Sequence, residues 1–173
     1  MNEIAEVRVV ESVDSLFRAH YARLVRALTL ACSDQELAAD AVQEAFVKAH
    51  LHWRRIQHYD DPVGWIRRVA INRLHDDHRR QNRKGIALRR LAGEPQVQPV
   101  EQHDFDPDLQ NILAQLPKQQ RIAIALFYVD ELSVAEVAAA LNVTVGAVKS
   151  YLHQGRARLR SVVASGEEVH SDE

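Results

Sequence analysis

The stretch SVAEVAAALNVTVGAVKSYLHQGRARLR, residues 133–160, decides the fold of the C-terminal half, because it contains two amphipathic segments around a short break. The first segment places four apolar residues at the i, i+3, i+4 and i+7 positions of one helix face: Val134, Val137, Ala138 and Leu141. Asn142 follows, and asparagine tolerates the left-handed conformation that ends many helices. The pattern therefore predicts a short helix that stops at Asn142.

The second segment has one apolar side and one basic side. Thr144 can cap its first turn. The apolar stripe contains Val145, Val148, Leu152 and Leu159, and the basic stripe contains Lys149, His153, Arg156 and Arg160. Two short helices joined by a tight turn form a helix-turn-helix, whose second helix can enter the major groove of DNA. The alternative is an ordinary helical hairpin with a solvated basic face.

Charge is segregated along the chain of 173 residues, although the net charge is only −2. Residues 34–47 contain four acids and no base, whereas residues 65–84 contain seven Arg or Lys against two Asp. Residues 144–160 contain four cations and no acid. The total charge argues against a generic nucleic-acid binder, but this segregation indicates one acidic and two basic surfaces.

The composition favours a soluble, cytoplasmic protein without membrane insertion. Cys32 is the only cysteine, which excludes a disulfide within the chain and a cysteine-based zinc site. The acidic start MNEIAEVR is not a secretion signal. The longest apolar run, Ile122–Val129, is far shorter than the ~18 residues that a membrane-spanning helix needs.

Breaker residues divide the chain into two helical parts. Residues 1–61 lack Gly and Pro, Ser33–Glu36 (SDQE) reads as a capping box, and Asp61-Pro62 reads as a helix start. Five Gly or Pro fall between Gly85 and Pro107, which indicates a flexible linker; a long ordered loop within one domain is the alternative. We expect an all-α fold of two small helical domains, with boundaries at 12–84, 85–107 for the linker, 108–162, and 163–173 for a tail.

Two blocks of sequence resemble one known family. LPKQQRIAIALFYVDELSVAEVAAALNVTVGAVKSYLHQGRARLR (residues 116–160) resembles region four of bacterial RNA polymerase sigma factors. DQELAADAVQEAFVKAH (residues 34–50) and GWIRRVAINRLHDDHRR (residues 64–80) resemble region two. The resemblance covers roughly residues 12–162 and is to the compact extracytoplasmic-function (ECF) group.

The resemblance implies an alternative sigma factor rather than an enzyme, with no cofactor or metal. Such a protein binds core RNA polymerase, recognises the minus-thirty-five and minus-ten promoter elements and promotes DNA melting. An anti-sigma factor is a further implied partner, and it could hold the two domains together. The family docks on the clamp of the polymerase largest subunit through a motif that is Asp40, Gln43 and Glu44 here; a solvated acidic face is the alternative.

The family captures the minus-ten element as a single strand on a loop and the helix after it. The matching residues are His58, Tyr59, Asp60, Trp65, Arg67, Arg68, Asn72 and Arg73. They supply phosphate-binding charge, planar groups and hydrogen-bonding groups, which single-strand capture requires. Trp65 is alternatively a core residue.

The helix-turn-helix of the family reads the minus-thirty-five element. The matching residues are Thr144, Val145, Gly146, Lys149, Ser150, His153 and Arg156. The chain departs from the family pattern where Asn142 replaces the usual turn glycine and where Tyr151 and Gln154 replace common arginines.

Two other classes of protein fit parts of the pattern. A one-component helix-turn-helix regulator would bind duplex DNA without polymerase, but it does not need the basic segment Trp65–Arg80. A metal-dependent enzyme would use the HDDH run at His75–His78, although the chain has no HExxH motif or phosphate-cradling glycine loop.

Overall fold

The computed structural model describes residues 12–88 and 107–168, and every regular element in these ranges is an α-helix. The helices are α1 (Val13–Cys32), α2 (Gln35–Leu51), α3 (Trp53–Ile56), α4 (Pro62–Leu88), α5 (Pro107–Ala114), α6 (Lys118–Tyr128), α7 (Val134–Leu141) and α8 (Val145–Glu168). The predicted all-α fold of two helical domains is confirmed.

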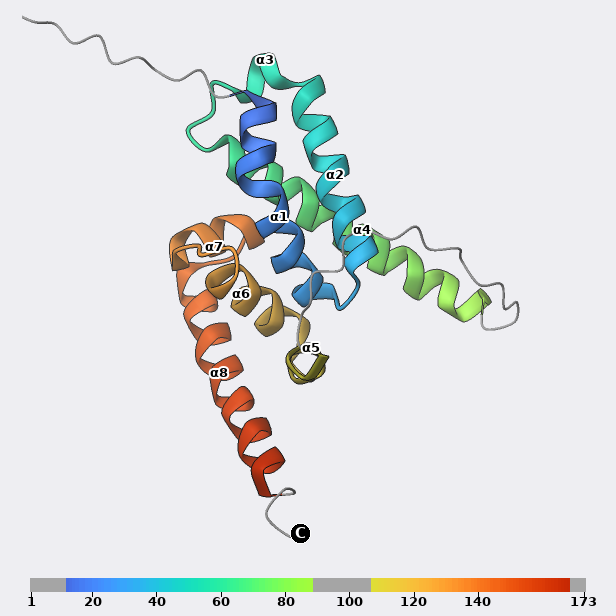
Figure 1. Cartoon of the computed structure of the whole chain (residues 1–173), viewed down its shortest axis with the longest axis vertical. Helices are drawn as coiled ribbons and strands as arrows, with labels where there is room; N and C mark the ends of the chain where they lie inside the picture. The colour runs from blue at the N-terminus through green and yellow to red at the C-terminus, as the bar shows by residue number, and fades with distance from the viewer. Residues whose placement is uncertain (1–11, 89–106, 169–173) are drawn as a thin grey trace, which may run out of the picture.

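Helices α1 to α4 form the N-terminal unit, in which α2 packs between α1 and α4 (Figure 1). Small residues at the helix contacts, such as Ala38 and Ala45, are fully buried and allow the helix axes to approach closely. Larger side chains fill the remaining core, including Leu28, Val42 and Ile66. The apolar spacing of the sequence therefore corresponds to the inner face of each helix.

Helices α5 to α8 form the C-terminal unit, and α6 crosses α8 closely. Gly155 of α8 lies at this crossing, where an added Cβ atom would approach Ile124 Cδ1 of α6 to 2.5 Å and the isoleucine side chain would have to shift. Val148 and Leu152 are buried beneath α7 and α6, as the predicted apolar stripe requires. The C-terminal part of α8 extends away from the body of the molecule (Figure 1).

The two units pack against each other as well as within themselves. Helix α1 contacts α5 and α6, and α4 contacts α7, so that one apolar cluster runs through both units. Helix α4 continues to Leu88, past the Gly85 at which the linker was expected to begin, and α8 continues past residue 163, the expected start of the tail. Residues 89–106, most of the predicted linker, lie outside the described residues, so its flexibility stays a prediction.

Most of the predicted helix ends form as expected. Ser133 and Glu136 make a reciprocal capping box, in which each side chain accepts the other residue's backbone N–H at 3.2 and 2.7 Å. Asn142 ends α7 in the left-handed conformation, with φ 54° and ψ 48°. The side chains of Asp61 and Thr144 cap α4 and α8 by accepting the backbone N–H groups of Gly64 and Ala147.

The capping box predicted at Ser33–Glu36 does not form, because the N-cap of α2 is Asp34, one residue after the predicted Ser33. Ser33 is instead the left-handed end of α1, with φ 60° and its N–H donating to Thr29 O. Asp34 caps α2, and its Oδ1 accepts the N–H of Leu37 at 2.9 Å. The physical reason is that α1 and α2 share a tight turn, in which one residue must end the first helix before the next can start the second.

Candidate functional site

Helix α2 presents the residues expected to meet polymerase. Asp40 and Gln43 are exposed, whereas Glu44 is half-buried between Lys48 and Arg73. These two cations, Lys48 first, hold the pKa of Glu44 below its ordinary value. Asp40 and Gln43 are therefore free to face a partner, while Glu44 also joins α2 to α4.

The exposed side of α2 continues into apolar residues that the sequence analysis did not single out. Val47 is 53% exposed and Leu51 is 70% exposed. They follow Asp40 and Gln43 at the three- and four-residue spacing of one helix face. The signal was present in the sequence, since an apolar residue outside the buried stripe of a helix has no core to fill.

The loop before α4 holds His58, Tyr59 and Asp60. His58 and Asp60 are exposed, and Tyr59 is partly buried, with the Arg55 guanidinium 6.0 Å from its ring centre. The loop is fixed at its end by the Asp61 cap, which leaves no room for a side chain at Gly64: a Cβ there would lie 2.0 Å from Asp61 Oδ2. The Asp61 cap therefore joins the end of the loop to the first turn of α4.

Arg67, predicted to contact promoter DNA, is buried and paired. It is only 6% exposed, and its Nε donates to Asp130 Oδ2 of the turn before α7 at 2.6 Å. Burial raises the pKa of Asp130 more than the neighbouring Arg67 lowers it. In this arrangement Arg67 does not reach the solvent in which DNA would bind.

Arg73 is also engaged by carboxylates. Its Nε donates to Glu44 of α2 and its Nη1 donates to Asp77 of α4. Arg68 and Asn72 are exposed, and Trp65 is partly buried against the core, as the alternative reading of that residue expects. The predicted minus-ten residues thus divide into a paired set and an exposed set.

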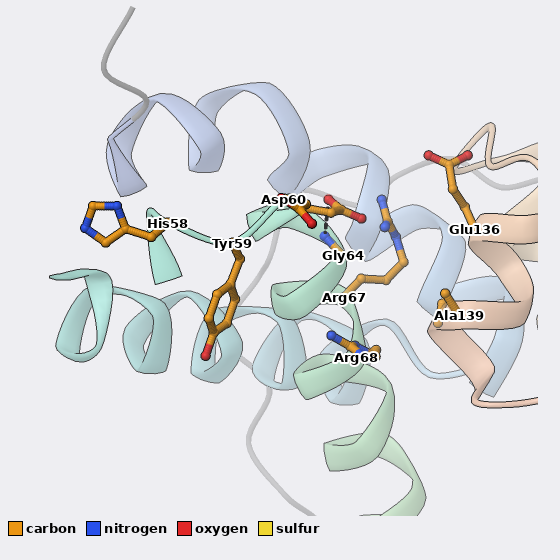
Figure 2. Close-up of a pocket in the computed structure, with 10 residues that line it drawn as sticks. His58, Tyr59, Asp60, Gly64, Arg67, Arg68, Glu136 and Ala139 are labelled. Atoms are coloured by element: carbon orange, nitrogen blue, oxygen red, sulfur yellow. Dashed lines mark hydrogen bonds between the residues drawn. The ribbon is translucent and has the colours of Figure 1, made fainter. Parts of the chain in front are cut away.

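Two crevices separate the predicted minus-ten surface from α7. The first, of about 550 Å³, has the loop at His58–Asp61 and the start of α4 on one side and Glu136, Ala139 and Ala140 on the other. Figure 2 shows Arg67 extending from α4 toward the helix that carries Glu136 and Ala139. The second, of about 510 Å³, places Arg68 and Asn72 opposite Leu141 and Asn142, among other residues.

The second helix of the helix-turn-helix, α8, presents most of its predicted contacts to solvent. Thr144, Gly146, Lys149, Ser150 and His153 are exposed. Val145, predicted on the apolar stripe and also among the DNA contacts, is 42% exposed and therefore belongs to the outer surface.

Arg156 differs from the rest of its stripe. Its Nε donates to Tyr128 Oη at 2.7 Å, and its guanidinium carbon lies 5.5 Å from the ring centres of both Phe127 and Tyr128. The structure thus brings Arg156 onto α6, half-buried, while Lys149 and His153 remain on the surface.

The two residues that replace family arginines have contacts of their own. Tyr151 packs against the core cluster. Gln154 accepts from Gln120 Nε2 at 2.9 Å and donates to Ser150 Oγ at 3.1 Å. Both side chains therefore make contacts within the C-terminal unit, Tyr151 by packing and Gln154 by hydrogen bonds.

Within residues 12–88 and 107–168, no group of three or more His, Cys, Asp or Glu side chains is arranged to hold a metal ion. None of the helices in the described part of the chain combines the length and the apolar character that crossing a bilayer requires.

Comparison with protein families identifies two domains of one class. The Sigma-70 region 2 family matches residues 16–84, and the Sigma-70 region 4 family matches residues 107–159. Both crevices beside α4 lie between these two domains. The class is therefore that of the sigma factors, which bind core RNA polymerase and promoter DNA and are not enzymes.

Individual relatives show which family of sigma factors the chain resembles. The ECF RNA polymerase sigma factor SigE of Mycolicibacterium smegmatis is 33% identical over 94% of this chain, which spans 64% of that protein. The RNA polymerase sigma-E factor of Streptomyces coelicolor is 31% identical over 79% of this chain and 77% of its own length. The chain belongs to the ECF family of RNA polymerase sigma factors.

A solved structure shares the fold. The sigma factor RpoE from Bartonella quintana, in complex with the anti-sigma factor NepR, superposes with a TM-score of 0.72 over 87% of this chain and 96% of that one, at 21% identity. The two family matches and the curated relatives, rather than this likeness of fold, do not favour a regulator that acts without polymerase or a metal-dependent enzyme.

Proposed function

We propose that this chain is an alternative sigma factor that works in the cytoplasm and uses three separate surfaces in transcription initiation. The outer side of α2 docks on core polymerase, the loop and outer side of α4 capture the minus-ten strand, and the start of α8 reads the minus-thirty-five element. The observation that carries the proposal is the presence of both sigma domains, in order, with exposed Asp40, Arg68 and Lys149 on these three surfaces.

The docking surface combines charge with apolar contact. Asp40 and Gln43 supply polar groups, and Val47 and Leu51 supply exposed apolar area on the same side of α2. Exposed acids steer association with a basic partner, and burial of apolar side chains adds affinity that does not depend on salt. Glu44 contributes chiefly by fixing α2 against α4 through Arg73.

The minus-ten surface uses the exposed members of the predicted set together with the partly buried Tyr59. Arg68 offers charge to a phosphate, Asn72 offers both a donor and an acceptor to a base, and Tyr59 offers a planar ring. His58 and Asp60 flank them on the loop. Arg73 supports this surface from behind through its pairs with Glu44 and Asp77.

The minus-thirty-five surface lies at the N-terminal end of α8. Lys149 and Ser150 face base edges, His153 lies one turn further on, and Thr144, Val145 and Gly146 form the end that enters the groove. We also propose an anti-sigma factor as a partner, because the Bartonella protein of the same fold was solved with one.

The docking assignment is tested with purified core polymerase and the full chain. We expect Asp40→Arg with Gln43→Ala to abolish co-purification with core polymerase and promoter-dependent transcription, because both side chains are exposed and neither supports the fold. The matched control is Asp76→Arg, which reverses an exposed charge on α4 instead. Unchanged co-purification of the α2 variant would contradict the docking assignment, and absence of transcription by the wild type on a genomic promoter library would contradict the proposed function.

A further inference from the structure

Three polar side chains connect the core of the C-terminal unit with the outer surface of α8. Gln120 of α6 is only 5% exposed, and its Nε2 donates to Gln154 Oε1 of α8 at 2.9 Å. Gln154 Nε2 in turn donates to Ser150 Oγ at 3.1 Å, one helical turn nearer the start of α8. These three residues, here called the polar relay, join a buried amide to a residue of the minus-thirty-five surface.

The close crossing of α6 and α8 brings the buried end of the polar relay within reach of α8. A Cβ atom added at Gly155 would lie 3.6 Å from Gln120 Cβ, so the backbone of α8 approaches α6 at the position next to Gln154. An arginine at position 154, as is common in the family, has no acceptor atom and could not accept from Gln120. Glutamine supplies both the acceptor and the donor that the polar relay needs.

The polar relay has a direction, because each amide has one accepting end and one donating end. Gln154 accepts from Gln120 through Oε1, and its Nε2, which can only donate, is therefore turned toward Ser150. Gln120 Oε1 is buried and accepts no hydrogen bond from the described residues. With both amides turned over, Gln154 would instead accept from Ser150, and the serine hydroxyl would have the opposite role.

The Ser150 hydroxyl is consequently left with its hydrogen to offer. A hydroxyl has one donor and two acceptor lone pairs, and one lone pair of Ser150 Oγ receives the N–H of Gln154. A serine inside a helix often donates to the carbonyl four residues earlier. Ser150 is exposed, however, and within residues 12–88 and 107–168 its hydroxyl donates to no group. Its hydrogen is therefore available to a partner outside the chain.

Base edges in the major groove differ in what they offer such a donor. Guanine presents two acceptors, N7 and O6, and thymine presents the acceptor O4, whereas cytosine presents only the N4 donor. Cytosine could use just the remaining lone pair of Ser150, and the hydroxyl hydrogen would then have no acceptor in the groove. A hydroxyl that is fixed as a donor thus favours guanine or thymine over cytosine.

We propose that Gln154 is a positioning residue for promoter recognition: it acts through Ser150 and makes α8 prefer guanine or thymine over cytosine at the base that Ser150 faces. The inference rests on the proposed function, since it takes the start of α8 as the surface that reads the minus-thirty-five element. It adds the class of base edge that is read there. It assigns this choice to Gln154 and Gln120, neither of which is among the predicted DNA contacts.

The buried end of the polar relay is what fixes its orientation. A hydrogen bond between two exposed side chains competes with water and holds neither of them firmly. Here Gln154 is also bonded to a side chain of the core, which holds its amide in one orientation. Loss of Gln120 should therefore relax the preference at Ser150, although Gln120 is buried and lies 34 positions before Gln154.

The test uses holoenzyme assembled from core polymerase and the full chain, bound to promoter duplexes with a randomised upstream element and sequenced after selection. Ser150→Ala identifies the base pair that Ser150 reads, as the pair at which the wild-type preference falls by about fivefold. At that pair we expect the wild type to favour guanine or thymine over cytosine. A wild type that favours cytosine there, or an unchanged preference of Ser150→Ala at every pair, would overturn the inference.

Gln154→Glu reverses the polar relay, because a carboxylate still accepts from Gln120 but no longer donates to Ser150. The hydroxyl then donates to the carboxylate and presents lone pairs to DNA, so we expect the ratio of guanine or thymine to cytosine to fall by about tenfold. Ala157→Glu, the matched control, adds the same charge at an exposed position of α8 and should weaken binding to all sequences alike. A wild-type ratio in Gln154→Glu would refute the role of Gln154.

Gln154→Met and Gln120→Met break the polar relay without adding charge. We expect each to lower the same ratio by about threefold to fivefold and to leave the preferences at other base pairs unchanged, whereas a merely structural role would alter affinity for all sequences alike. Unchanged ratios in both variants, with a wild type that still selects an upstream sequence, would overturn this inference alone. A wild-type holoenzyme without any preference in the upstream element would contradict the proposed function itself.

Discussion

Helices α4 and α8 share one sequence pattern, an apolar side and a basic side, but they pack against different neighbours in the fold. Each has an apolar side in the core and cations on its outer side. On α4, Arg67 and Arg73 form ion pairs with Asp130, Glu44 and Asp77. On α8, Lys149 and His153 are exposed, and the cation of that stripe nearest the core, Arg156, bonds to a tyrosine hydroxyl.

The difference lies in which elements pack beside each helix. Helix α4 contacts both α2 and α7, and the carboxylates that pair with its arginines come from α2, from the turn before α7 and from α4 itself. Helix α8 is contacted by α5, α6 and α7, and its exposed residues Thr144, Lys149 and Ser150 leave its first turns open for a groove of DNA. A basic stripe in a sequence therefore predicts positive charge, but its availability to a ligand depends on the neighbouring elements.

The strongest test of this comparison concerns two consecutive residues of α8, of which Val148 faces the core and Lys149 faces solvent. Val148 is fully buried, and we expect Val148→Asp to destabilise the C-terminal unit by more than about 3 kcal/mol, because an isolated carboxylate would enter an apolar core. Circular dichroism during heating would show the loss of helix. Lys149→Asp is the matched control: it should remain folded and lose promoter binding. Similar melting temperatures of Val148→Asp and Lys149→Asp would contradict the placement of Val148 in the core and of Lys149 on the surface.

We expect the substitution of Lys149 to change the sequence preference of DNA binding and the substitution of Arg156 to lower stability. We expect Lys149→Ala to change the preference of holoenzyme among minus-thirty-five sequences by about 1–3 kcal/mol if it contacts a base edge. Binding to a series of upstream variants by fluorescence anisotropy would measure this preference. Equal losses on all sequences would instead indicate that Lys149 contacts only phosphate.

For Arg156→Ala the contact with Tyr128 leads us to expect a loss of stability of about 1 kcal/mol with an unchanged salt dependence of DNA binding. Tyr128→Phe is the matched control, since it removes only the hydroxyl that accepts from Arg156. A decrease of about one in the salt slope of Arg156→Ala would show that this arginine moves onto a phosphate in the complex.

The neighbours Asn72 and Arg73 provide the corresponding test on α4. We expect Arg73→Ala to lower the free energy of unfolding by about 1 kcal/mol, because its ion pairs join α2 to α4 but remain partly solvated. Asn72→Ala should leave stability unchanged and impair promoter opening. Permanganate footprinting would detect the missing open thymines, and a pre-melted template should restore activity if the defect lies in melting. Equal opening by Asn72→Ala and the wild type would refute the role of Asn72.

The smallest expected effect concerns the turn between α7 and α8. Asn142 has the left-handed conformation in which families of this kind often have glycine. We expect Asn142→Gly to change stability by less than about 0.5 kcal/mol, since relief of backbone strain is offset by the greater entropy of glycine in the unfolded chain. Asn142→Ala should cost about 1 kcal/mol, because alanine is poorly suited to this conformation. Chemical denaturation resolves the two variants.

Local patterns predicted the helices well where the determining interactions are close in sequence. The capping box at Ser133 and the Asp61 cap depend on residues three positions apart, and both form as expected. The error at Ser33 has the same origin, since both Ser33 and Asp34 suit a helix boundary and only the geometry of the turn assigns one to each helix.

The sequence by itself determined the helical fold, the apolar side of each helix, the family and the identity of the candidate contact residues. Only the tertiary structure decided which of those residues are paired. Arg67 and Asp130 are separated by 63 positions, and no periodicity or motif links residues so far apart. Their contact exists because α4 and α7 pack together, and packing fixes the distances between charges that sequence patterns leave undefined.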